Sequence, residues 1–329
     1  MTVTAPKVMW EPSQAAIESA QITQFARYCV HRFRLRLNTY AEFYRWSCDA
    51  PEQFWSAVWD WCGVRGTKGS RVLVDRDRMP GAKWFPDARL NFAENLLRRR
   101  DASDALVYWD ETGCRARTSH AQLADGVSRA AQALRAAGVQ PGARVAAFMP
   151  NMPETCVLAL AAIAVGAVWS SCSPDFGSDG VLERFGQIEP GLLFCADGYR
   201  YNGKVYDSIG RVRDIVAELP SVREVIVVPN LAERPEVSTI STISSIRNAR
   251  RLADWIAPYP AAEIDFEQLP FDHPLYILFT SGTTGKPKCI VHGAGGSLLA
   301  GLKMYKLQLD VRPLDRFFYY TTCNWVMWN

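Results

Sequence analysis

The chain has 329 residues, 48% of them hydrophobic, which is enough for about two domain-sized units with buried cores. Its net charge of +3 argues against a nucleic-acid-binding or membrane-surface protein, since both need clustered positive charge. The nine cysteines are scattered without a C-x-x-C pair, which argues against a disulfide framework or a structural zinc site. The N-terminus lacks the apolar core of a signal peptide, and the longest apolar run, Cys156–Trp169, is too short to span a bilayer. We therefore expect a cytoplasmic protein that binds neither nucleic acid nor membranes.

Up to about residue 100 the sequence is helical and rich in aromatic residues. Apolar side chains between Ile22 and Phe33 recur at the spacing of one helix face. A later helix is predicted to begin at Asp49 as its N-cap, with Pro51 in the first turn. Six of the eleven tryptophans precede Leu90, which indicates a packed aromatic cluster rather than a surface that stacks nucleobases.

From about Asp104 onward, predicted strands and helices alternate. The strands are expected at 105–110, 144–149, 167–173, 192–196 and 225–228, and the helices at 119–138, 153–166, 181–188 and 208–219. Ser119 and Gln122 have the spacing of a capping box at the start of the first of these helices. The alternation predicts an α/β fold with a mostly parallel sheet and helices on both faces.

The segment from Asn230 to Gln268 is rich in Ser and Thr and is predicted to be an irregular excursion on the surface. An apolar strand, Leu275–Thr280, then leads directly into a loop of Gly, Ser, Thr and Lys that ends at Lys288. A second strand at 289–292 and a helix at 296–307 are expected to follow.

This loop has the composition of a phosphate-binding site. Glycines let backbone N–H groups approach an anion closely, hydroxyls add donors, and lysines add positive charge. The residues concerned are Thr280, Ser281, Gly282, Thr283, Thr284, Gly285, Lys286 and Lys288. A plain Gly/Thr turn is the alternative, which so long a run of these residue types disfavours.

Two common nucleotide-binding classes do not fit the loop. A P-loop NTPase needs four residues between its glycines and Ser or Thr after the lysine, whereas Gly282 and Gly285 have two between them and Pro287 follows Lys286. A redox dinucleotide fold needs G-x-G-x-x-G after its first strand, and the glycines near residue 295 do not follow that pattern.

The stretch YILFTSGTTGKPKCIVH resembles the phosphate loop of the adenylate-forming superfamily, which includes acyl-CoA synthetases, luciferases and peptide-synthetase adenylation domains. Residues 118–151 and 158–176 are similar to the first two helix–strand units of that superfamily, and residues 40–63 and 84–97 resemble the N-terminal region of the acetyl-CoA synthetase type. Within this group, residues 173–204 and 312–329 look most like the members that activate acetoacetate.

The resemblance implies the large N-terminal domain of an adenylate-forming enzyme, with layered, mostly parallel sheets and flanking helices, truncated before completion. It implies an N-terminal helical and aromatic region at 1–103 and an incomplete AMP-binding domain at 104–329. It also implies a ligase reaction with ATP, Mg²⁺ and coenzyme A (CoA). The carboxylate of acetoacetate would attack the α-phosphate of ATP, and the CoA thiol would then displace AMP.

The resemblance assigns roles to residues one by one. The loop residues from Thr280 to Lys288 named above would hold the phosphates of ATP, while Trp325 and Asn324 would line the acyl pocket. Relatives usually carry Gly where Asn324 stands, which bears on the choice of acid; a core tryptophan is the alternative for Trp325. Arg200 and Lys204 match residues that bind a CoA phosphate, although the spacing is shifted and favours two exposed surface charges. His292, just past the loop, fits a structural role.

Other family features have no match before Asn329. These are the Thr-Glu segment that stacks adenine and helps to bind magnesium, the aspartate for the ribose, and the small C-terminal domain with the catalytic lysine. We therefore expect a fragment that does not complete the reaction alone, is poorly soluble or unstable, and pairs with a complementing C-terminal chain. The alternative is a non-catalytic remnant that at most binds nucleotide phosphates or a partner chain.

Overall fold

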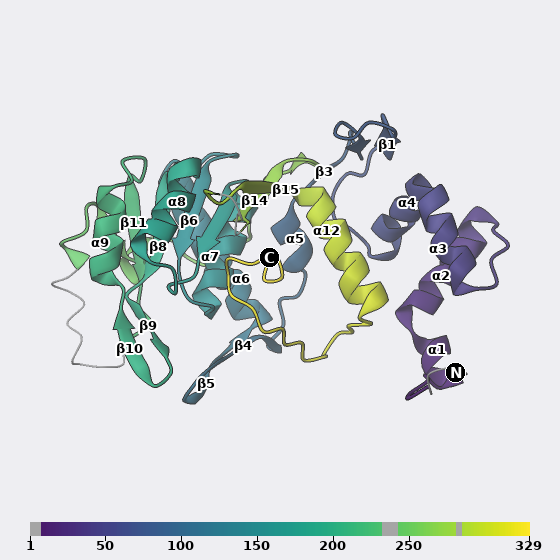
Figure 1. Cartoon of the computed structure of the whole chain (residues 1–329), viewed down its shortest axis with the longest axis horizontal. Helices are drawn as coiled ribbons and strands as arrows, with labels where there is room; N and C mark the ends of the chain where they lie inside the picture. Colours follow the sequence, from purple (N-terminus) through teal and green to yellow (C-terminus); the bar gives the residue numbers. More distant parts are fainter. Residues whose placement is uncertain (1–7, 232–242, 281–284) are drawn as a thin grey trace, which may run out of the picture. The chain divides into compact units, whose positions relative to one another are not determined.

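The computed structural model describes residues 8–231, 243–280 and 285–329 (Figure 1). The chain divides into two compact units, each assembled from separate stretches of sequence. The first unit is Met1–Val64, Ser70–Trp84 and Ser297–Phe318, and the second is Arg65–Gly69, Phe85–Gly296 and Tyr319–Asn329. The domain bounds at 103 and 104 stay a prediction.

The first unit is a helical cluster around aromatic side chains. Its elements are α1 (Gln14–Ser19), α2 (Gln21–Phe33), α3 (Tyr40–Asp49), α4 (Pro51–Trp61), β1 (Leu73–Val74), β2 (Lys83–Trp84) and the π-helical turn η1 (Lys303–Gln308). Phe25 is fully buried, and its ring centroid lies 5.9 to 6.0 Å from those of Phe43, Phe54 and Trp61. Such aromatic pairs contribute about 0.5–1.5 kcal/mol each beyond their burial. The predicted aromatic cluster is confirmed.

The expected N-cap of α4 was wrong. Asp49 is the last residue of α3, and Ala50 occupies the N-cap position of α4 without a side-chain hydrogen bond. A capping box between Thr39 and Glu42 starts α3, and the N–H of Ala50 bonds to the carbonyl of Trp46, so the helix continues to Asp49. Because a single residue separates the two helices, Asp49 keeps a helical backbone and cannot cap α4.

The second unit is built on a seven-stranded sheet with the order β12-β11-β8-β6-β7-β14-β15. Its strands are β6 (Arg144–Phe148), β7 (Val168–Cys172), β8 (Leu192–Ala196), β11 (Glu224–Val228), β12 (Ala249–Arg251), β14 (Pro274–Phe279) and β15 (Cys289–Gly293). All neighbours pair in parallel except β14 and β15, which are antiparallel. The mostly parallel α/β fold predicted from the sequence is confirmed.

Helices cover both faces of this sheet, as the buried strands require. They are α5 (Phe92–Leu96), α6 (His120–Ala136), α7 (Pro153–Ala164), α8 (Ser178–Ile188), α9 (Ile209–Ala217) and α11 (Leu252–Ile256), and α12 (Ala294–Leu302) follows β15. Leu193 and Cys195 of β8 belong to the same core cluster as Phe185 of α8 and Ile215 of α9. Phe194, on the opposite face, lies with its ring 5.7 Å from that of Trp255 of α11.

Two local predictions had different outcomes. The capping box of Ser119 and Gln122 is present at the start of α6, as predicted. The expected surface excursion after Asn230 was partly wrong, because Trp255 is 2% exposed and packs against the sheet. An indole buries enough apolar area to anchor a short helix in a segment of otherwise polar composition. Residues 232–242 lie outside the described residues.

Two hairpins extend from the second unit beyond the sheet (Figure 1). One joins β4 (Asp104–Asp110) to β5 (Gly113–Ser119), and the other joins β9 (Gly198–Tyr201) to β10 (Lys204–Asp207). A further two-stranded sheet pairs β3 (Arg89–Leu90) with β13 (Leu269–Pro270). Over the described residues, no helix is long and apolar enough to cross a bilayer.

Candidate functional site at the carboxyl edge of the sheet

A pocket of about 370 Å³ opens at the carboxyl ends of the parallel strands. Three strands end in the same way, with proline followed by Asn or Asp: Pro150-Asn151 after β6, Pro174-Asp175 after β7 and Pro229-Asn230 after β11. All six of these residues line the pocket, together with side chains of the two hairpins. In open parallel sheets, ligands bind at this edge, and the volume is that of a small-molecule site.

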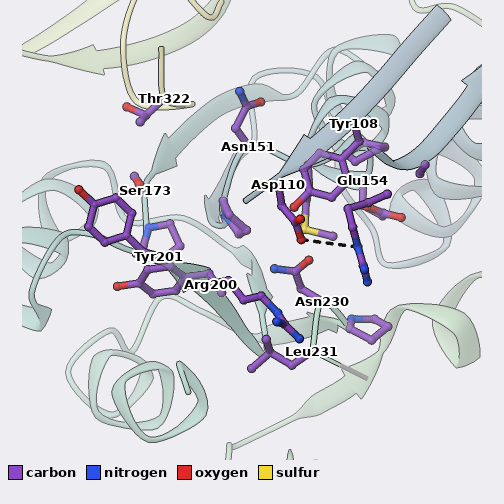
Figure 2. A pocket seen from close by; sticks show the side chains of 18 of the residues that line it. Tyr108, Asp110, Asn151, Glu154, Ser173, Arg200, Tyr201, Asn230, Leu231 and Thr322 are labelled. Carbon is purple, nitrogen blue, oxygen red and sulfur yellow. Dashed lines mark ion pairs between the residues drawn. The ribbon is translucent and has the colours of Figure 1, made fainter. Parts of the chain in front are cut away.

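Charged and aromatic side chains of the two hairpins face each other across the pocket (Figure 2). From the β4–β5 hairpin, Asp110 forms an ion pair with Arg115 at 3.5 Å between Oδ2 and Nε. From the β9–β10 hairpin, Arg200 extends toward Leu231 (Figure 2). Burial opposes ionisation of Asp110, but hydrogen bonds from Thr112 and the charges of Arg115 and Arg200 outweigh it and lower its pKa. The pocket thus presents fixed charges of both signs.

A second carboxyl group in the pocket lies in a drier environment. Glu154 is in the first turn of α7, and burial raises its pKa above the usual value. Burial also raises the pKa of Tyr108, and the nearby charges of Asp110 and Glu154 add to this effect. Tyr108 therefore stays a neutral hydrogen-bonding phenol over the physiological range.

A buried aspartate holds the base of the β9–β10 hairpin. Asp197, 1% exposed, follows β8, and its Oδ1 accepts the backbone N–H groups of Asn230 at 2.7 Å and Leu231 at 3.1 Å. Its Oδ2 is buried without a hydrogen-bond partner among the described residues. Burial raises the pKa of Asp197, and backbone N–H bonds from Asn230, Leu231 and Gly198 offset this only in part. One carboxyl group thus ties the end of β11 to the end of β8.

Asp197 should make stability depend on pH. Because its pKa is higher in the folded protein than the ordinary 3.8, the folded state binds the proton more tightly than the unfolded chain. Asp197 therefore contributes most to the free energy of unfolding when the pH is below 3.8. Stability is then lost as the pH rises through the raised pKa, by up to about 1.4 kcal/mol per pH unit.

Asp197→Asn keeps a side-chain oxygen that accepts the two N–H groups but cannot bind or release a proton in this pH range. We therefore expect stability to depend less on pH and to be equal or higher at pH 7. Denaturant unfolding between pH 4 and 7.5 measures the difference. Asp214→Asn, at an exposed position on α9, is the control. Parallel profiles for wild type and Asp197→Asn would contradict the assignment.

The exit of the predicted phosphate loop is held against the sheet, whereas Ser281, Gly282, Thr283 and Thr284 lie outside the described residues. Thr280 at the end of β14 donates its N–H to the carbonyl of Lys288 at 3.1 Å, which brings the two ends of the loop together. Gln187 of α8 donates its side-chain N–H to the carbonyl of Pro287 at 2.9 Å. Lys286 and Lys288 are exposed, as is Gly285. Both cations are therefore open to a ligand at the carboxyl edge.

The other predicted residues are only partly brought together. Arg200 lines the pocket, whereas Lys204 is exposed on β10 and is not among the lining residues. Trp325 is 60% exposed, so a core role for it is excluded. Asn324 accepts a hydrogen bond from the hydroxyl of Thr322, a pocket residue, at 2.7 Å.

His292 has the environment of a structural residue. Its ring lies 4.9 Å from that of Tyr276 on the neighbouring strand. Partial burial lowers its pKa, so the neutral imidazole is favoured.

Several pocket residues were not predicted from the sequence. They are Tyr108, Asp110, Asn151, Glu154 and Asn230. The three strand ends with Pro followed by Asn or Asp would have indicated two of them, because such ends meet at one edge of a parallel sheet. No comparable signal marks Tyr108 or Asp110, which come from a separate hairpin.

Comparison with known proteins defines the class. The profile of the AMP-binding enzyme family matches residues 92–328, and the profile of the acetyl-coenzyme A synthetase N-terminus matches residues 40–96. The first match covers well over half of the chain, and the chain belongs to the AMP-binding enzyme family.

Individual relatives are more specific. The chain is 47% identical over 325 residues to an acetoacetyl-coenzyme A synthetase from Rhizobium meliloti, with 99% of this chain and 49% of the relative covered. It is 38% identical to an acetoacetyl-CoA synthetase from Xenopus tropicalis, with 98% of this chain and 48% of the relative covered. The solved acetoacetyl-CoA synthetase from Streptomyces lividans superposes with a TM-score of 0.89 at 44% identity, and 98% of this chain and 49% of that chain are covered. The chain thus spans about half the length of the curated relatives it matches.

Proposed function

We propose that this chain takes part in an acetoacetate–CoA ligase reaction. The observation that carries the proposal is the common location of Thr280, Lys288 and the Arg200 pocket at the carboxyl edge of one mostly parallel sheet. Names shared by relatives at 38–47% identity over nearly the whole chain support acetoacetate as the acid. Sequence matching the second half of those relatives, in the same polypeptide or in a complementing chain, belongs to the proposal. The cytoplasmic location stays a prediction.

The proposed reaction has two balanced steps. A carboxylate oxygen of acetoacetate attacks the α-phosphorus of ATP, and the bond to the bridging oxygen breaks to release pyrophosphate. The sulfur of CoA then attacks the acyl carbon, loses its proton, and displaces AMP. In the first step, Lys286 and Lys288 would neutralise charge that develops on the leaving pyrophosphate.

The described residues include groups that fit CoA but no cluster that fits Mg²⁺. Arg200 and Arg115, with the aromatic rings of Tyr108, Tyr199 and Tyr201, fit the phosphorylated nucleotide end of CoA. The 3′-phosphate is a monoester with a charge near −2, which suits a guanidinium that projects from a hairpin. Among the described residues, no group of three His, Cys, Asp or Glu side chains is arranged for a metal ion. Mg²⁺ therefore enters the proposal through family membership alone.

Exchange of labelled pyrophosphate into ATP tests the first step. With the sequence that matches the second half of the relatives present, in the same polypeptide or as a complementing chain, we expect acetoacetate-dependent exchange. It should fall about 100-fold in Lys288→Ala and in Lys286→Ala, since each variant removes a charge that stabilises the leaving group. Lys83→Ala, at an exposed lysine of β2, is the matched control. Absence of exchange in this completed wild type would contradict the ligase proposal and favour a nucleotide-phosphate-binding protein without catalysis.

A further inference from the structure

One carboxylate joins the two hairpins that form the pocket. Glu111 lies in the turn of the β4–β5 hairpin, and its Oε2 accepts the backbone N–H of Gly203 at 2.7 Å. Its Oε1 accepts the backbone N–H of Asn202. Each carboxylate oxygen therefore receives one amide from the tip of the β9–β10 hairpin. The two tips lie together although they are separated by about 90 residues of chain.

The tip of the β9–β10 hairpin is shaped for this contact. Asn202 and Gly203 have φ values of 52° and 71°, the left-handed pair of a two-residue hairpin turn. Asn and Gly tolerate this conformation best. Successive N–H groups in a tight turn form a concave donor site for an anion. A carboxylate is thus a natural partner for this turn.

The turn that carries Glu111 is itself held in place. Oδ1 of Asp110 accepts the backbone N–H of Thr112 at 2.7 Å and its hydroxyl at 2.6 Å. Asp110 also pairs with Arg115 on the opposite strand. Asp110 and Thr112 on either side of Glu111 are therefore held by hydrogen bonds, and the backbone position of Glu111 is fixed.

The contact between Glu111 and the hairpin tip affects the position of Arg200, which lines the pocket. Arg200 is two positions before Asn202 on β9 and pairs in register with Val205 of β10. Next to this pair, Tyr199 and Tyr206 are also in register, and their rings stack with centroids 5.0 Å apart, which holds the two strands together. A displacement of the tip would therefore shift the guanidinium of Arg200 relative to Asp110 and Arg115.

We propose that Glu111 is a positioning residue that fixes the β9–β10 hairpin, and with it Arg200, for the 3′-phosphate of CoA. The proposal rests on the function proposed above, because it takes the Arg200 pocket as the CoA site. Glu111 itself does not touch the ligand: its carboxylate is occupied by the two amides, and its charge would repel a phosphate.

The test compares the binding of CoA with that of dephospho-CoA, which lacks the 3′-phosphate, by titration calorimetry on the full chain. Wild type should prefer CoA, and Arg200→Ala should lose about 10-fold or more of that preference. Glu111→Ala should lose most of the same preference. Because Tyr199 and Tyr201 lie on the same hairpin, its affinity for dephospho-CoA should also fall, but by a smaller factor than its affinity for CoA. The double variant should lose no more than Arg200→Ala alone, because both changes remove one interaction. Glu218→Ala, at an exposed glutamate after α9, is the matched control.

Hydrogen exchange at the Asn202 and Gly203 amides gives a second readout that needs no ligand. Faster exchange in Glu111→Ala and in Glu111→Gln is expected. Equal weakening of both ligands, or a full CoA preference in Glu111→Ala, would overturn the positioning role and leave the CoA site intact. Failure of the wild type to prefer CoA would instead overturn the CoA site, and the role of Glu111 with it.

Discussion

Asn91→Asp is expected to lower the free energy of unfolding by about 3 kcal/mol or more at pH 7, although the side chain hardly changes in size. Asn91 is 1% exposed, and its amide nitrogen donates to the carbonyl oxygens of Ile163, Ala164 and Glu267 at 2.9 to 3.2 Å. A carboxylate there would place a buried negative charge against three acceptors. Denaturant unfolding at pH 7 measures the loss.

The Asn91→Asp variant removes the amide donor of the side chain and keeps its capping oxygen. Its oxygen accepts the N–H groups of Ala93 and Glu94 and caps α5, and Asp keeps this function. The loss should shrink as the pH falls, because a protonated carboxyl group can donate to one carbonyl. Asn248→Asp is the control, since its amide makes one exposed bond, to the carbonyl of Arg223 at 3.0 Å. Equal stability losses in the two variants would show that the three hydrogen bonds donated by the Asn91 amide contribute little.

Gly198→Ala should remove the CoA binding that we propose for the Arg200 pocket and lower stability by about 1–3 kcal/mol through overpacking. A Cβ at Gly198 would lie 2.3 Å from the carbonyl oxygen of Tyr206 and 2.4 Å from Cδ1 of Leu231. The first atom belongs to the paired strand β10, so the hairpin would have to separate. Arg200, two residues further on, would move with it. Calorimetric titration with CoA and thermal unfolding measure the two effects.

Substitution of Gly186 by alanine should instead raise the stability of the protein. Gly186 is exposed within α8, and a Cβ there meets no atom within 4 Å. Alanine is favoured over glycine in a helix interior by about 0.8–1 kcal/mol, so Gly186→Ala should raise stability and leave CoA binding unchanged. Stabilisation by both variants would contradict the close approach at Gly198.

The sheet could be predicted because each of its elements carries a local signal. Leu193, Phe194 and Cys195 lie in an unbroken apolar run bounded by turn residues, which is typical of a strand buried on both faces. The capping box of Ser119 and Gln122 marks the start of α6 from two residues alone. Trp255 was missed because its burial depends on Phe194, which lies far away in the sequence.

The candidate site could be predicted only where a motif is continuous. The loop ending at Lys288 is one run of chain, and its residue types indicate phosphate without any neighbour. The pocket instead combines Asp110 and Arg200, from two hairpins separated by about 90 residues. The bonds of Glu111 to Asn202 and Gly203 that join these hairpins involve backbone amides, which leave no trace in the sequence.

The prolines after β6, β7 and β11 have a consequence for redesign of this protein. Pro150, Pro174 and Pro229 have no N–H, so each closes the hydrogen-bonded ladder of its strand at a comparable level. Strand register is settled before these prolines, and the pocket-lining residues Asn151, Asp175 and Asn230 come directly after them. Residues beyond the prolines should therefore tolerate exchange in a library without a change in the sheet. Asn151, Asp175 and Asn230 can therefore be varied together to select new ligands for the pocket at the carboxyl edge of the sheet.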